Sequence, residues 1–139
     1  MNLVLGTLVM QNNKILILKR SRKVLTYTWL WDFVGWYLDD AKPPEQKAID
    51  ELEEEIGISG SEDVLSIQCL KRIVQYDDVI NKVWVNFPTM IILKDNAQII
   101  LDEEHDEYKW VTKDELEKYE LVPGTLALYD YIQTFNQNS

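Results

Sequence analysis

The chain has 139 residues, of which 46% are hydrophobic and 27% charged, and its 24 acidic against 14 basic side chains give a net charge of −10. This composition excludes a disordered segment and predicts one globular domain over residues 1–139. The acidity excludes a protein held to nucleic acid by charge alone, so we expect no stable nucleic-acid partner. A single cysteine and a single histidine exclude an internal disulfide and a zinc centre of thiolates and imidazoles, so any metal must be held mainly by oxygens.

The chain shows no signal for a membrane or for export. No apolar run approaches the roughly 20 residues that a membrane helix requires. The first residues lack the basic start and apolar core of a signal peptide. We therefore expect a cytoplasmic protein with no membrane partner.

Seven segments rich in β-branched and aromatic residues predict strands. They are residues 3–10, 15–18, 27–34, 65–73, 79–93, 99–101 and 108–111. Asn12 and Asn13, between the first two segments, predict a tight hairpin turn, because asparagine tolerates a positive φ better than most residues.

Three helices are predicted along the chain. The first begins at the prolines of residues 43–44, whose fixed φ suits a first turn, and ends before Gly57, which suits the left-handed position after a helix. Thr112 and Glu115 form a capping box that opens a second, short helix. The last helix covers about residues 125–135. Strands interleaved with few helices predict a mixed sheet with helices on its faces.

The first helix carries an unusual number of carboxylates. Glu51, Glu54 and Glu55 are spaced so that they share one edge of the helix. Two of them lie in the last turn, where the helix dipole disfavours anions. A bound divalent cation such as Mg²⁺, which prefers oxygen ligands, would remove this penalty. The spacing therefore favours a metal site, and a solvated acidic face is the alternative.

Residues 36–58 resemble the Nudix box, G-x5-E-x7-R-E-U-x-E-E-x-G-U, in which U is aliphatic. The positions that match are Glu51, Leu52, Glu54, Glu55, Gly57 and Ile58. Three specified positions differ, because Trp36, Lys42 and Asp50 stand where the box has glycine, glutamate and arginine. The box is therefore degenerate, but its helical half is present.

Two flanking segments extend this resemblance over nearly the whole chain. Residues 31–35, Trp-Asp-Phe-Val-Gly, resemble the tryptophan and proline-glycine-glycine segment that precedes the box, with Val34 in place of proline. Residues 104–110 resemble a late segment of the MutT-like branch. The resemblance implies the α/β (α+β) class, as a Nudix-type α/β/α sandwich with a mixed, partly antiparallel sheet.

The resemblance also implies an activity and a set of site residues. The expected enzyme is a hydrolase of the diphosphate linkage in a nucleoside diphosphate linked to another group, such as a nucleoside triphosphate or a nucleotide sugar. The implied ligands of Mg²⁺, or of Mn²⁺ in its place, are Glu51, Glu54, Glu55 and the carbonyl of Gly35. The catalytic candidates are Glu51, Glu54 and Glu104. Either Glu51 or Glu104 would be the base, Glu103 is a weaker candidate, and His105 is expected at the substrate edge or in a structural role.

The departures from the box carry expectations of their own. Lys42 and Asp50 reverse the signs of the family pair, so we expect an exchanged ion pair between loop and helix, with two unrelated surface charges as the alternative. Trp36 could line the substrate pocket, pack within its loop or block the site. Arg20, in the basic run of residues 19–23, is the expected substrate-binding residue, and a solvated hairpin end is the alternative.

Three functions compete at this point. The first is the magnesium-dependent hydrolase with a small-molecule nucleotide as substrate. The second is a Nudix-fold nucleotide-binding or regulatory module whose catalysis is weakened by the three departures. The third is an acidic protein-interaction domain. The nucleotide and the oligomeric state, a homodimer included, stay open.

Overall fold

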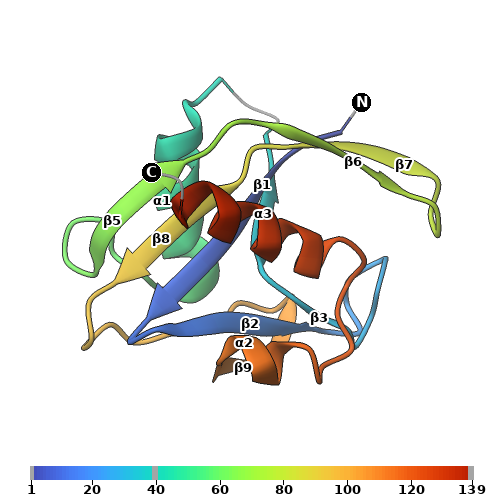
Figure 1. The fold of residues 1–139 in the computed structure, drawn as a ribbon. Coiled ribbons are helices and arrows are strands. Elements are labelled where there is room, and N and C mark those ends of the chain that lie inside the picture. The colour runs from blue at the N-terminus through green and yellow to red at the C-terminus, as the bar shows by residue number, and fades with distance from the viewer. Residues whose placement is uncertain (1, 39–40, 138–139) are drawn as a thin grey trace.

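The computed structural model describes residues 2–38 and 41–137 of the chain. Its elements are shown in Figure 1. The strands are β1 (Asn2–Gln11), β2 (Lys14–Arg20), β3 (Trp31–Asp32), β4 (Val34–Tyr37), β5 (Val64–Cys69), β6 (Ile73–Asp77), β7 (Lys82–Asn86), β8 (Thr89–Leu93) and β9 (His105–Val111). The helices are α1 (Pro44–Ile56), α2 (Lys113–Leu116) and α3 (Thr125–Gln137).

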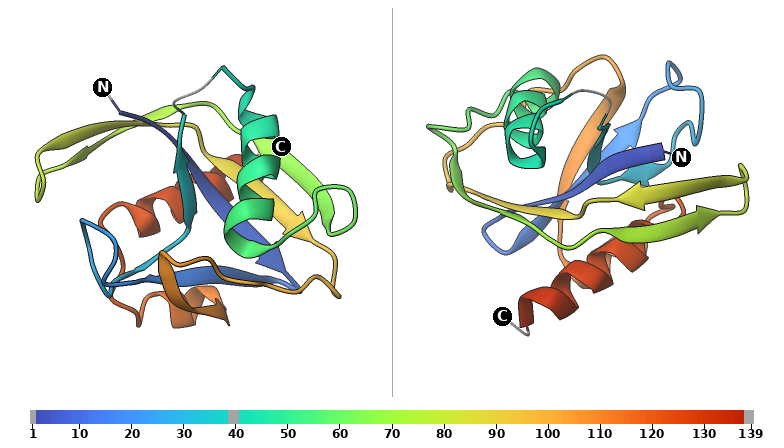
Figure 2. Two further views of the ribbon diagram at one scale, coloured as in Figure 1. Left: turned by 180° about the vertical axis from the view of Figure 1, so that it is seen from behind. Right: turned by 90° about the horizontal axis from the view of Figure 1, so that it is seen from above.

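The strands form one mixed sheet with β1 at its centre. β1 pairs antiparallel with β2 and β4, and parallel with β7 and β8. The remaining pairs, β2 with β3 and β9, β5 with β8 and β6 with β7, are all antiparallel. Figure 2 shows α1 on one face of the sheet and α3 on the other. This confirms the predicted class and the α/β/α layering.

Each face of the sheet has its own apolar layer. On the α1 side, Ala48, Leu52 and Ile56 are fully buried against the sheet, as helical periodicity predicts. On the α3 side, Leu128 and Ile132 pack over the strands. The sheet therefore holds α1 in a fixed position. Within the described residues, no helix is both long and apolar enough to cross a membrane.

The local signals in the sequence were reliable. Asn12 and Asn13 form the predicted turn, with φ of 53° and 63°. Gly57 ends α1 with a φ of 68°. In the capping box, the amide of Glu115 donates to Oγ1 of Thr112 at 3.3 Å, and the amide of Thr112 donates to Oε1 of Glu115 at 3.0 Å.

Four of the predicted strands differ from the structure. Residues 27–34 are largely loop, and only the short β3 and the start of β4 are extended there. The predicted strands 65–73 and 79–93 are each broken in two, the second at Pro88, which cannot donate to a strand ladder. Residues 99–101 form no strand.

Residues 99–101 instead cross the C-terminal end of α1. The amide of Ile100 donates to the carbonyl of Ile56 at 2.9 Å, and the amide of Asp102 donates to the carbonyl of Glu55 at 3.0 Å. The last carbonyls of a helix have no partner within the helix. The segment satisfies two of them and is thereby fixed beside the acidic turn.

Candidate active site

An acid cluster lies at the C-terminal end of α1. Glu55, Asp102 and Glu104 each offer a carboxylate oxygen, and these oxygens lie within 4.8 Å of one another. The backbone bond from Asp102 to Glu55 joins the two segments. Nδ1 of His105 lies 3.0 Å from Oδ1 of Asp102 and orients that carboxylate. Among the described residues, these three acids are the group that could hold a metal ion.

The electrostatics of the acid cluster favour a cation. Burial, together with the negative charges of Asp102, Glu104 and Glu51, raises the pKa of Glu55 to about 8. The indole N–H of Trp36 lies near enough to oppose this rise in pKa. Its Nε1 is nevertheless buried without a hydrogen bond of ordinary geometry to any described residue. Glu55 is therefore mostly protonated at neutral pH unless a positive ion replaces the proton.

Two of the predicted acids lie outside this close group. Glu51 faces Lys47, whose Nζ is 3.0 Å from Oε1 of Glu51. Lys47 is itself buried, with 7% of its surface exposed, so its aliphatic stem packs while its ammonium group holds the carboxylate. Glu54 is exposed on the same helix. Glu55 therefore lies beside the loop acids Asp102 and Glu104, whereas Glu51 forms an ion pair with Lys47.

Lys42, in the loop before α1, forms an ion pair with Asp50 in the middle of the helix. Nζ of Lys42 lies 2.6 Å from Oδ2 of Asp50, the geometry that an exchanged ion pair requires. Gln46 donates to the other carboxylate oxygen at 2.9 Å. The hydrogen bonds from Lys42 and Gln46 lower the pKa of Asp50. The loop before α1 is therefore tied to the helix at this point.

A cavity of about 230 Å³ opens on the α3 side of the sheet. Its walls come from β1, β4, the β6–β7 hairpin, the loop after β2 and the first turn of α3. Gly35 and Trp36 line it from β4. Trp36 is only 6% exposed and belongs to the core under α1, so most of its ring lies outside the cavity.

Arg20 and Asp32 are the charged pair of this pocket. Nη1 of Arg20 lies 3.7 Å from Oδ2 of Asp32, and its Nε donates to the carbonyl of Thr26 at 3.0 Å. Oδ1 of Asp32 accepts from the amide of Phe33 at 2.8 Å and from Oγ1 of Thr125 at 3.4 Å. Burial raises the pKa of Asp32 to about 6, although Arg20 and these donors oppose the shift.

Amide side chains complete the polar lining. Asn86 accepts from the amide of Gly6 at 2.8 Å and donates to Oε1 of Gln75 at 3.0 Å. A Cβ at Gly6 would lie 2.7 Å from both Asn86 and Leu128, so only glycine fits there. The pocket therefore presents a built set of donors and acceptors of the kind that orients a small polar ligand.

The loop of residues 21–30 connects the pocket to the acid cluster. Ser21 directly follows Arg20, and its amide donates to the carbonyl of Glu104 at 2.9 Å. At the far end of the loop, the hydroxyl of Tyr27 donates to Asp77 on β6. Tyr27 and Trp29 both adopt a positive φ, which is costly for aromatic residues. The loop is therefore held in place by tertiary contacts.

Sequence reasoning missed several residues of this region, among them Asp102, Lys47 and Asp32. Asp102 belongs to the acidic run 102–107, which was a usable signal. Lys47 is a lone base in the acidic helix, four residues before Glu51, and that spacing was also a signal. Asp32 had no such signal, because the side chains that contact it, Arg20 and Thr125, are distant from it in the sequence.

Comparison with known proteins identifies the family. The model of the NUDIX domain matches residues 3–132. No curated protein matches this sequence.

Several solved structures share the fold. The NUDIX domain of NrtR from Shewanella oneidensis, complexed with ADP ribose, has a TM-score of 0.77 at 17% identity, covering 99% of this chain and 88% of that one. The Ap4A hydrolase of C. elegans has a TM-score of 0.74 at 16% identity, with 100% of both chains covered. The MutT protein of Methanosarcina mazei has a TM-score of 0.72 at 19% identity, covering 97% and 94%. The family match spans most of the sequence and the fold agrees with it, so the chain belongs to the NUDIX domain family.

Proposed function

We propose that the chain is a metal-dependent hydrolase that cleaves the diphosphate linkage of a nucleotide. The observation that carries this proposal is that the loop of residues 21–30 contacts the acid cluster through Ser21 and lines a polar pocket through Thr26 and Tyr27. The nucleoside would lie in the pocket and the phosphates would extend toward the acid cluster. Similar structures include a complex with ADP ribose and an Ap4A hydrolase, which supports a substrate of this class.

The donor set fits a hard divalent ion. Three carboxylates within 4.8 Å, one of them with a raised pKa, form an anionic site whose repulsion a cation would offset. Mg²⁺ or Mn²⁺ would be held by these three acids, and the family resemblance adds Glu51, Glu54 and the carbonyl of Gly35. Such an ion, when bound, offsets the charge of phosphate oxygens and lowers the pKa of a bound water.

The chain itself must supply a proton acceptor. Oε1 of Glu51 is engaged by Lys47, which leaves Oε2 to accept a proton from the attacking water. Glu104 is the second candidate, since it belongs to the acid cluster and its carbonyl is fixed by Ser21. Arg20 adds positive charge at the wall of the pocket, on the side of the loop that leads to Glu104.

The buried position of Trp36 favours catalysis over a blocked site. The large ring could have filled the pocket, since the family has glycine there. It packs instead with the core residues under α1, including Leu52 and Ile56. The pocket keeps its volume, so this departure from the box leaves room for a substrate.

The test is hydrolysis with Mg²⁺ or Mn²⁺ of a panel that contains 8-oxo-dGTP, ADP-ribose, diadenosine polyphosphates and NADH. We expect turnover of at least one compound, and Glu55→Gln and Glu54→Gln should each lower it by more than about a hundredfold. Glu53→Gln is the matched control, because this neighbour is exposed on the same helix. Turnover that survives both substitutions would contradict the metal site. Binding of a panel compound without any turnover would instead support the weakened module.

A further inference from the structure

β6 is a free edge of the sheet. It ends the strand order β3-β2-β1-β7-β6, and within residues 2–38 and 41–137 it pairs with β7 alone. Figures 1 and 2 show the β6–β7 hairpin extending beyond the rest of the sheet. A two-stranded ribbon is only marginally stable by itself, and an unpaired edge is a ready template for another strand.

The two faces of this hairpin differ, because one face lines the pocket and the other exposes apolar side chains. Gln75 and Asp77 of β6 line the pocket. The alternate residues Val74 and Tyr76 face away from it and are 69% and 63% exposed. Val83, which pairs with Tyr76 across the hairpin, is 42% exposed. The outward face thus presents an apolar patch, with no charge at the middle of the edge strand to protect it.

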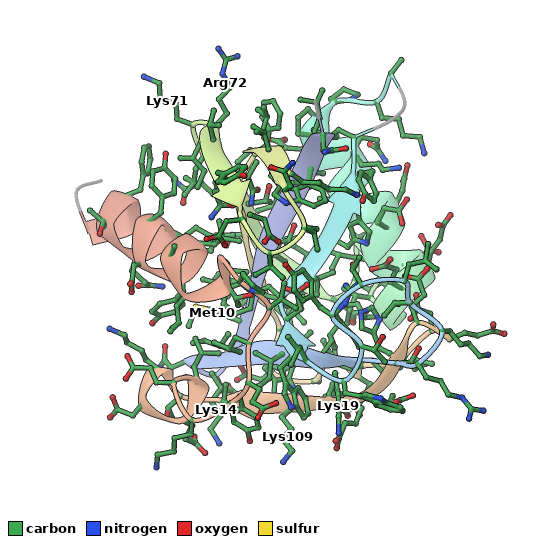
Figure 3. The ribbon with its side chains drawn as sticks, turned by 90° about the vertical axis from the view of Figure 1, so that its right-hand side faces the viewer. Met10, Lys14, Lys19, Lys71, Arg72 and Lys109 are labelled. Carbon is green, nitrogen blue, oxygen red and sulfur yellow. The ribbon has the colours of Figure 1, made fainter. Side chains whose placement is uncertain are left out.

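The charges stand at the two ends of the strand. Lys71 and Arg72 precede β6, and both project away from the body in Figure 3. At the other end, Asp77 is the last residue of the strand and Asp78 follows it. Residues 71–78 therefore begin with two basic side chains, are uncharged in the middle and end with two acidic side chains. Such a segment is complementary to a second copy of itself in antiparallel orientation, as a two-fold symmetric contact requires.

We propose that β6 binds β6 of a second copy of this chain as an antiparallel pair centred on Gln75. In this register Val74 lies opposite the partner's Tyr76, and Arg72 lies opposite the partner's Asp78. Both contacts occur twice by symmetry. Val74 and Tyr76 lie on the exposed face of the strand, because alternate residues share a face, and Arg72 and Asp78 are the exposed residues that flank its two ends.

The two neighbouring symmetric registers are less favourable. Antiparallel pairing places residues of the same hydrogen-bonding class opposite each other, so the next centres are Tyr76 and Val74. A centre at Tyr76 places Val74 opposite the partner's Asp78 and Arg72 opposite the partner's Ile80.

The other centre is Val74. Lys71 would then face the partner's Asp77, which is only 8% exposed and already accepts a hydrogen bond from Tyr27. Asp78 would have no basic residue opposite. The centre at Gln75 satisfies both ends of the strand.

The contact would join two hairpins into one four-stranded sheet. The inward residues of β6 would then belong to a larger sheet, so the wall of each pocket would be braced by the other copy. The association does not depend on any reaction. Its failure would therefore leave the proposed hydrolase activity untouched.

The test is sedimentation velocity over a series of protein concentrations. The unmodified chain should form dimers, at the latest at about 100 μM for an edge contact of this size. Arg72→Asp places like charges opposite each other, and so does Asp78→Arg, so each variant alone should be monomeric. An equal mixture of the two should form dimers, because every aspartate then faces an arginine. Lys118→Asp, at an exposed site just after α2, makes the same change of charge sign and should leave the dimer intact.

Three results would overturn the proposal. The first is an unmodified chain that stays monomeric at about 100 μM. The second is a dimer that persists in both single variants, since it must use another surface. The third is a mixture of the two variants that stays monomeric although each is folded by circular dichroism.

Discussion

Binding of a metal ion to the acid cluster should release a proton at neutral pH. Since burial raises the pKa of Glu55 to about 8, about 0.9 of the molecules carry a proton on this carboxyl group at pH 7, and about 0.1 do at pH 9. A divalent cation binds the carboxylate form and must displace this proton. The apparent affinity should therefore be about tenfold weaker at pH 7 than at pH 9.

Titration calorimetry with Mn²⁺ measures both quantities. When the experiment is repeated in buffers of different ionisation enthalpy, the slope of the observed heat gives the number of protons released. We expect about 0.9 at pH 7 and about 0.1 at pH 9. Glu55→Gln should weaken binding and remove its pH dependence, whereas Glu53→Gln should change neither. Tight binding to the unmodified chain at pH 7 with heats that are the same in every buffer would refute the reasoning.

Three further predictions concern the charges around the site. Lys47→Met should lower kcat roughly tenfold or more at unchanged thermal stability, because Glu51 loses the ammonium group 3.0 Å away. Lys47→Arg should restore part of kcat. Equal rates in the two variants would exclude a positioning role for Lys47. Asp32 has a folded-state pKa of about 6, above its unfolded value, so the unmodified chain should lose stability relative to Asp32→Asn as the pH rises from about 4 to 6. A difference in Tm between these two proteins that is constant over this window would show that the carboxyl group is not desolvated. Reversing Lys42 and Asp50 together should restore the Tm that each single reversal lowers; additive losses would mean that the two charges do not interact.

The elements that the sequence predicted well are those specified by neighbouring residues. The turn at Asn12 and the limits of α1 follow from backbone preferences that act over one or two residues. The capping box of α2 is equally local. The acidic residues of α1 already favoured a cation site, since anions in the last turn of a helix are unfavourable without a bound cation.

The parts that could not be predicted depend on distant contacts. Residues 99–101 have a strand composition, but their amides bond the open end of α1, and this places Asp102 beside Glu55. The aromatic residues of the loop 21–30 also suggested a strand. That loop is held instead by hydrogen bonds from Tyr27 to Asp77 and from Ser21 to Glu104. Neither bond could be predicted from neighbouring residues in the sequence.

The central position of β1 decides when the chain can fold. Its hydrogen-bonding partners include strands from the second half of the sequence, with Leu3 beside Val85 and Thr7 beside Thr89. β1 can pair early with β2 and β4, but its parallel partners are missing until β8 has been synthesised. Pairings between such distant segments make folding slow and leave the nascent chain open to aggregation, which chaperones could prevent. A truncated chain that ends before β7 should accordingly gain no stable structure.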